Sequence, residues 1–162
     1  MATPSETTPS EDLAVLVVDE EPDILAFFAK ILDANGIRAL LARTPSEAIG
    51  IAKRGYVPVD IVVTDIALRP DINRKSGQTS SHPVEDSFTS GRDLVDELRN
   101  LRPGVRALYM SAYVDSGVIR IELMDRDFKT NSKNPDDRGL IASIRHAASA
   151  PMVYRAGSFS GN

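Results

Sequence analysis

The chain has 162 residues, of which 42% are hydrophobic and 26% charged. This length supports one well-buried core, and we expect a single domain over residues 13–148 between tails at 1–12 and 149–162. The net charge of −4 offers no basic surface, and the absence of cysteine excludes disulfides, thiolate zinc sites and cysteine nucleophiles. No apolar run reaches membrane-spanning length and no signal peptide is recognisable, so we expect a cytoplasmic protein without membrane or direct nucleic-acid contacts.

Two apolar runs that end in acidic residues are the most informative feature. Residues 14–18 are followed by Asp19 and Glu20, and residues 59–64 are followed by Asp65. Such runs are typical of strands buried on both faces of a parallel sheet, and ligands collect outside the carboxyl ends of these strands. Three carboxylates at one edge repel one another unless a cation is bound, which favours Mg²⁺ or another hard divalent ion.

The first half of the chain alternates between strand and helix patterns. An apolar stripe after Pro22 predicts a helix that ends at Asn35-Gly36, and a short strand is expected over 37–42. Thr44 and Glu47 have the spacing of a capping box and predict a second helix before the strand that carries Asp65.

The second half continues the alternation with weaker signals. Ser90 to Asp93 resembles a helix cap, and the helix is expected to stop at Pro103-Gly104 before a strand over 105–111. We further expect a helix over 118–124, a polar strand over 128–132 and a last helix from Asn134 onward. The alternation predicts a doubly wound, five-stranded parallel sheet with helices on both faces.

One segment interrupts this pattern. Residues 69–89 are rich in Ser, Asp, Asn, Pro and Gly and follow directly on the Asp65 strand. Their composition predicts a loop insertion beside the acids, more in keeping with a mobile segment than with an ordered partner surface. The segment contains His82, which we interpret as a solvated loop residue rather than a metal ligand.

Four motifs together resemble the receiver domain of two-component response regulators, over residues 13–148. They are Val17-Val18-Asp19-Glu20-Glu21-Pro22, Val63-Thr64-Asp65, Met110-Ser111-Ala112-Tyr113, and a lysine 22 positions after Ser111 (133 − 111 = 22). We prefer Lys133 to Lys129 for this last part because it also precedes Asn134-Pro135. The resemblance, closest to chemotaxis-type single-domain proteins, implies a flavodoxin-like fold.

The resemblance also implies a chemistry. Asp65 is expected to accept a phosphoryl group from a phosphohistidine, with Mg²⁺ or Mn²⁺ held by Asp19, Glu20, Asp65 and the backbone carbonyl of Ala67. Lys133 is expected to pair with the phosphoryl oxygens and Ser111 to donate a hydrogen bond to one of them. The implied partners are a histidine kinase or histidine phosphotransfer protein and an unknown downstream protein. This is autophosphotransfer, not enzymatic turnover on a free substrate.

Departures from the family pattern keep alternatives open. Glu20 stands where the family more often has Asp, and Thr130 stands where it usually has an aromatic or apolar residue. Glu21 is either part of the acidic pocket or simply an acid in the first helical turn. A pseudo-receiver, which binds partners without phosphorylation, is therefore the first alternative. The second is a haloacid-dehalogenase-type phosphohydrolase, but Asp65 is followed by Ile66-Ala67, so the second Asp which that family needs as general acid is missing.

Overall fold

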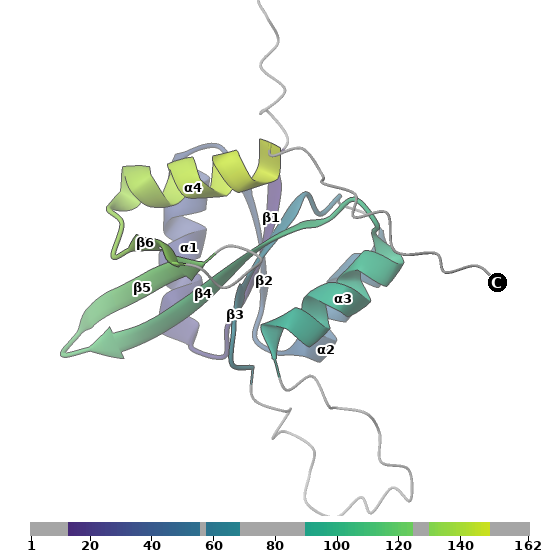
Figure 1. Ribbon diagram of the computed structural model, residues 1–162, viewed down its shortest axis with the longest axis horizontal. Helices are drawn as coiled ribbons and strands as arrows, with labels where there is room; N and C mark the ends of the chain where they lie inside the picture. Colours follow the sequence, from purple (N-terminus) through teal and green to yellow (C-terminus); the bar gives the residue numbers. More distant parts are fainter. Residues whose placement is uncertain (1–12, 56–57, 69–89, 125–129, 150–162) are drawn as a thin grey trace, which may run out of the picture.

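The computed structural model describes residues 13–55, 58–68, 90–124 and 130–149, and for 130–133 the backbone only. In this part of the chain, six strands form one sheet in the order β2-β1-β3-β4-β5-β6 (Figure 1). The strands are β1 (Ala14–Val18), β2 (Arg38–Ala42), β3 (Ile61–Asp65), β4 (Arg106–Asp115), β5 (Val118–Met124) and β6 (Thr130–Lys133). β1 to β4 pair in parallel, whereas β5 is antiparallel to both of its neighbours.

Helices cover both faces of this sheet. α1 (Pro22–Ala34) and α4 (Asp137–Ser149) lie on one face, and α2 (Pro45–Arg54) and α3 (Gly91–Leu101) lie on the other (Figure 1). Each face has its own apolar layer because successive side chains of a strand point to opposite sides. In β1, Val15 and Val17 belong to the layer under α1 and α4, whereas Leu16 and Val18 belong to the layer under α2 and α3. The predicted doubly wound α/β fold is therefore confirmed.

The predicted helix caps are confirmed in α2 and α3. The Thr44 hydroxyl accepts a hydrogen bond from the Glu47 amide at 3.1 Å, and the Ser90 hydroxyl accepts one from the Asp93 amide at 3.2 Å. Each bond satisfies one of the amides that a helix leaves without an intrahelical partner at its first turn. These caps fix where the two helices begin, and the start of α3 lies beside the end of β3.

The helix predicted over residues 118–124 is wrong, because this segment is strand β5. Ile119, Ile121 and Leu123 alternate with Val118, Arg120 and Glu122, and the first set packs in the layer under α1 and α4. That period of two is a strand pattern, and Val and Ile favour strands through their branched side chains. A helical interpretation of the apolar positions overlooked this alternation.

A tight turn joins β4 to β5. Ser116 and Gly117, the two residues between the strands, have φ values of 51° and 79°. Positive φ at both central residues is the geometry of a two-residue turn that matches the twist of a hairpin, and Gly adopts it without strain. The outer part of this hairpin, residues 112–121, is called the β4–β5 arm below. It extends beyond the helices at the left of Figure 1.

The sheet differs in one further respect from the five parallel strands that we predicted. β5 lies between β4 and β6, so the last strand, at the sheet edge, does not pair with β4. Because β5 is antiparallel to both neighbours, β6 still runs in the direction of β1 to β4. Five strands thus share one direction, and the sixth is inserted between two of them. Of the predicted strand over 128–132, residues 130–132 belong to β6 and the rest lies outside the described residues.

Several predictions concern residues outside the described part. These are the tails at 1–12 and 150–162, and the insertion over 69–89 with His82. In the described ranges, no helix has both the length and the apolar character needed to cross a membrane.

An engineered disulfide distinguishes the hairpin from the helix first expected. The Asn134 amide donates a hydrogen bond to the Ile121 carbonyl, and the Ile121 amide donates one to Oδ1 of Asn134, on the side of β5 away from β4. The pair Ala112–Ile121 is therefore of the non-hydrogen-bonded type, and so is the pair Val114–Ile119, two residues further along each strand. The short separation of such pairs suits a disulfide. In this cysteine-free chain, we expect Val114→Cys/Ile119→Cys to form an intramolecular disulfide on mild oxidation, measured as a loss of two hydrogens by mass. The control Val114→Cys/Arg120→Cys places its thiols on opposite faces, and equal oxidation of both variants would contradict the hairpin.

Candidate functional site

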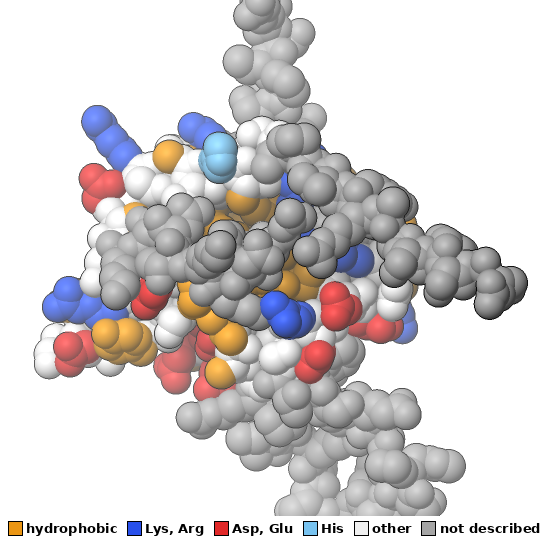
Figure 2. All heavy atoms as spheres, in the orientation of Figure 1, with side chains coloured by type: hydrophobic (Ala, Val, Ile, Leu, Met, Phe, Trp, Pro, Cys, Tyr) orange, Lys and Arg blue, Asp and Glu red, His pale blue; other side chains and the backbone are white. Residues whose placement is uncertain are grey.

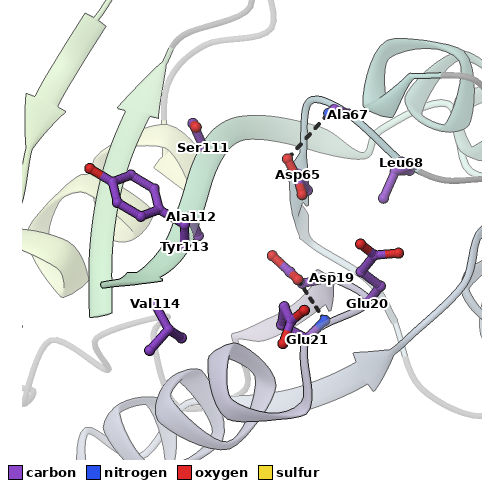
Figure 3. A pocket seen from close by; sticks show the side chains of 10 residues that line it. All are labelled: Asp19, Glu20, Glu21, Asp65, Ala67, Leu68, Ser111, Ala112, Tyr113 and Val114. Atoms are coloured by element: carbon purple, nitrogen blue, oxygen red, sulfur yellow. Dashed lines mark hydrogen bonds between the residues drawn. The ribbon is translucent and has the colours of Figure 1, made fainter. Parts of the chain in front are cut away.

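A pocket of about 540 Å³ opens at the edge where β1 and β3 end and where β4 passes on into the arm (Figure 3). Its walls come from the β1–α1 turn, the end of β3 and the outer part of β4. The lining residues are Asp19, Glu20, Glu21, Asp65, Ala67, Leu68, Ser111, Ala112, Tyr113 and Val114. The structure therefore brings together the predicted residues Asp19, Glu20, Asp65, Ala67 and Ser111, and the convergence of acids at the carboxyl edge is confirmed.

Asp19 is the most deeply buried acid of this pocket, with 1% of its surface exposed. Its Oδ1 accepts a hydrogen bond from the Glu21 amide at 2.8 Å, whereas the buried Oδ2 has no hydrogen-bond partner in the described residues. Burial raises the pKa of Asp19 to about 7, and the neighbouring acids Asp65, Glu21 and Glu20 add to the increase. A buried carboxylate oxygen without a hydrogen-bond donor destabilises the folded protein, so this site favours the binding of a proton or a metal cation.

Asp65 ends β3 and faces the same space. Its Oδ1 accepts a hydrogen bond from the Ala67 amide at 3.2 Å. Burial raises the pKa of Asp65, and the charge of Glu20 raises it further, while the amides of Ala67 and Ile66 act in the opposite direction. Asp19 and Glu20 extend from the β1–α1 turn toward Asp65 (Figure 3).

The donor set fits a hard divalent cation. In the described part of the chain, no three acidic or histidine side chains are gathered closely enough to hold a metal ion by themselves. Mg²⁺ does not require this, because it usually keeps several waters and binds only one or two carboxylates. Asp19, with its unpartnered oxygen, and Asp65 supply two. The predicted contributions of Glu20 and of the Ala67 carbonyl stay predictions.

Ser111 lines the pocket from inside a strand rather than from a loop. It pairs with Glu122 of β5, and β4 continues for four residues beyond it. Three exposed hydrophobic residues follow on the arm, namely Tyr113, Val114 and Val118, with 56%, 42% and 50% of their surfaces exposed. Hydrophobic side chains are visible on the arm at the left of Figure 2, above a group of acidic ones. The sequence motif that contains Tyr113 does not predict this apolar wall.

Lys133 lies at the end of β6, and its side chain is outside the described residues. The strand register aligns Ser111 with Glu122 and Glu122 with Lys133. Lys133 is therefore two strand spacings from Ser111, roughly 10 Å along the sheet. Its predicted contact with a phosphoryl group on Asp65 requires the side chain to reach across the ends of β5 and β4, and this contact stays a prediction.

Two residues around Asp65 were missed by sequence reasoning. The buried Thr64 hydroxyl donates a hydrogen bond to the Asp65 carbonyl at 3.1 Å, and the Gly91 amide donates one to the Ile66 carbonyl at 2.8 Å. In the sequence, Thr64 stands out only as part of a motif, and Gly91 only as part of a helix cap. Nothing in the local sequence pattern indicates that a helix start 26 positions further on (91 − 65 = 26) contacts the acidic strand end.

The raised pKa of Asp19 predicts how stability depends on pH. Because the folded-state pKa, about 7, lies above the ordinary value of 3.8, the folded protein holds this proton more tightly than the unfolded chain. The resulting stabilisation is complete below pH 4 and is lost as the pH rises toward 7 and beyond. We expect Asp19→Asn to raise the free energy of unfolding by about 1–3 kcal/mol at pH 8 in EDTA, and by almost nothing at pH 4.

Urea unfolding at the two pH values measures this difference. Asp96→Asn, at an exposed position of α3, is the matched control and is expected to change stability little at either pH. A destabilised Asp19→Asn at pH 8 would contradict the cost assigned to the buried charge.

Comparisons with known proteins concern mainly the fold. No protein-family model matches the chain, and no curated protein matches it. A CheY-like response regulator receiver domain protein from Methanospirillum hungatei JF-1 is 18% identical, with a TM-score of 0.56 over 84% of this chain and 93% of that one. The receiver domain of the hybrid histidine kinase CckA is 17% identical, with a TM-score of 0.55 over 83% and 98%.

A shorter alignment joins the chain to a response regulator receiver domain protein from Clostridium thermocellum. It is 23% identical, covers 59% of this chain and 61% of that protein, and has a TM-score of 0.44. The two longer alignments carry the comparison, since each spans nearly the whole of a known receiver domain. The fold of this chain is that of the response regulator receiver domains.

Proposed function

We propose that this chain is a two-component receiver that accepts a phosphoryl group from a phosphohistidine onto Asp65. The observation that carries the proposal is the pair of carboxylates, Asp19 and Asp65, which face one pocket at the carboxyl edge of the sheet with raised pKa values. Two neighbouring carboxylates away from water are unfavourable unless a cation binds between them, and acids with raised pKa values are concentrated at functional sites.

The cation's contribution is electrostatic. Mg²⁺ held by Asp19 and Asp65, with Glu20 and the Ala67 carbonyl as further ligands, would neutralise charge on the phosphoryl oxygens. The unpartnered Oδ2 of Asp19 and the all-oxygen donors support this assignment.

The other steps of phosphoryl transfer are assigned to side chains and amides of the chain itself. The Ala67 amide holds Oδ1 of Asp65, which leaves Oδ2 as the nucleophile. Oδ2 forms the new bond to phosphorus while the phosphorus–nitrogen bond of the phosphohistidine breaks, and the departing imidazole keeps the electron pair and takes up a proton. Ser111, at the pocket wall, would donate a hydrogen bond to a phosphoryl oxygen, and Lys133 would pair with another. The acceptor is not regenerated in this step, so the chain is a phosphotransfer partner rather than a turnover enzyme.

The partners follow from this role. A histidine kinase or a histidine phosphotransfer protein would supply the phosphoryl group, and an unknown protein would respond to the modified state. Because the arm forms one wall of the pocket, it is the described element that a downstream partner would contact together with Asp65.

A pseudo-receiver is the second candidate, and one observation favours it. β5 separates β4 from β6, so Lys133 is three strands away from Asp65 rather than two. If the lysine side chain does not reach the pocket, the phosphoryl group loses a charged partner. The fold would then persist as an interaction module without phosphorylation.

Phosphorylation by a small donor separates the two candidates. With acetyl phosphate and Mg²⁺, we expect intact mass spectrometry to detect one added phosphoryl group, absent after EDTA treatment and absent in Asp65→Asn. Asp60→Asn, which changes another acid of the same strand region, is the control and is expected to be modified. No gain of mass under conditions that modify an ordinary receiver would favour the pseudo-receiver.

The role of Lys133 has its own test. We expect Lys133→Gln to slow phosphorylation by acetyl phosphate at least about tenfold, because a charged donor to the phosphoryl oxygens is lost. Lys129→Gln, the matched change at the other candidate lysine, leaves Lys133 in place and is expected to keep the rate within about twofold. Equal rates in wild type and Lys133→Gln would remove Lys133 from the site.

A further inference from the structure

The first residue of α3 lies directly on the backbone of the phosphoacceptor. Gly91 is buried, and its amide donates a hydrogen bond to the Ile66 carbonyl at 2.8 Å. A Cβ atom at Gly91 would overlap the carbonyl oxygen of Asp65. It would also lie 3.0 Å from Cγ2 and 3.2 Å from Oγ1 of Thr64. The space beside the Asp65 carbonyl is thus filled by the α-carbon of a residue without a side chain.

Glycine is required at this position for space and not for backbone conformation. The described glycines with positive φ are Gly36, Gly55 and Gly117, so Gly91 has a backbone that any residue adopts. Alanine would therefore fit the helix start itself, whose first turn is already capped by Ser90. What alanine would not fit is the contact between this helix start and the end of β3.

The turn that carries Asp65 is held from three directions. The Ile66 amide donates to the Met110 carbonyl of β4 at 3.0 Å, and the Ile66 carbonyl accepts from Gly91 of α3. Within the turn, the Ala67 amide donates to Oδ1 of Asp65. Ile66 is held to β4 by its amide. If α3 moved away from Asp65, we therefore expect the backbone of the Asp65–Ala67 turn to change, and this turn orients the Asp65 carboxylate.

We infer that Gly91 is a positioning residue for the phosphoacceptor: its missing side chain lets α3 fix the backbone of Asp65 and Ile66 in the reactive orientation. This inference rests on the proposed function of Asp65. Ile66 precedes residues 69–89 and Gly91 follows them, so the described chain on either side of this segment is in contact next to Asp65.

The test compares three variants at a temperature at which each is folded by circular dichroism. In Gly91→Ala, helix and acceptor must separate by about 1 Å, a misplacement that can cost a factor of 100 in rate. We expect its rate of phosphorylation by acetyl phosphate with Mg²⁺ to fall roughly 10- to 100-fold. Leu98→Ala, a buried change in the same helix, is expected to lose more stability but to keep its rate within about twofold. Gly50→Ala, whose Cβ meets only Arg54 Nη2 at 3.5 Å, is expected to react like wild type.

Amide chemical shifts give a readout that does not depend on phosphorylation. We expect the ¹H–¹⁵N resonances of Asp65, Ile66 and Ala67 to move in Gly91→Ala and to stay near their wild-type positions in Leu98→Ala. Ser90→Ala, which loosens the helix start without adding atoms, covers the case in which Gly91→Ala does not fold. Its expected effect is a smaller rate loss with shifts at the same three amides.

The outcomes separate the inference from the proposed function. The inference would be overturned if the resonances of Asp65, Ile66 and Ala67 did not change in Gly91→Ala or, should that variant not fold, in Ser90→Ala. It would also be overturned if the rates of Gly91→Ala and Leu98→Ala fell in proportion to their loss of stability. A wild-type chain that is never phosphorylated would overturn the proposed function, and the amide shifts would still decide whether Gly91 fixes the Asp65 backbone.

Discussion

Electrostatic crowding of acidic side chains at the carboxyl edge of the sheet determines the character of the candidate site. β1 and β3 are buried side by side, so the acids that follow them are forced into one pocket. Asp19 is nearly inaccessible to water and has one carboxylate oxygen without a donor in the described residues. Such an arrangement costs stability in the protein alone and is relieved by a proton or by a cation. In the proposed function, both carboxylates would bind the cation and Asp65 would attack phosphorus.

Much of the fold and of this pocket could be predicted from the sequence because the signals are local and strong. The apolar runs that end at Asp19 and Asp65 have few interpretations other than buried parallel strands. Caps at Thr44 and Ser90 fix the helix starts through bonds between residues three positions apart. Once strands and helices alternate, the carboxyl ends of the strands must share an edge, and the acids meet there.

The β4–β5 hairpin could not be predicted in the same way. Residues 118–124 carry apolar positions that fit a helix as well as a strand, and the choice depends on the tight turn at Ser116-Gly117 and on pairing with β4. This one difference separates β6 from β4, places Ser111 within a strand and gives the pocket an apolar wall that ends in Val114. The contact of Gly91 with Asp65 was equally hidden, because it joins residues far apart in sequence through a space that only a missing side chain provides.

The chemical location of the phosphoryl group tests most directly whether Asp65 is the phosphoacceptor. After treatment with acetyl phosphate and Mg²⁺, borohydride reduction converts an aspartyl phosphate into homoserine, which peptide mass spectrometry assigns to a position in the chain. We expect homoserine at position 65 and unchanged aspartate at positions 19 and 60. Reduction at another aspartate, or at none while the chain is folded and Mg²⁺ is present, would contradict the assignment of Asp65 as the phosphoacceptor.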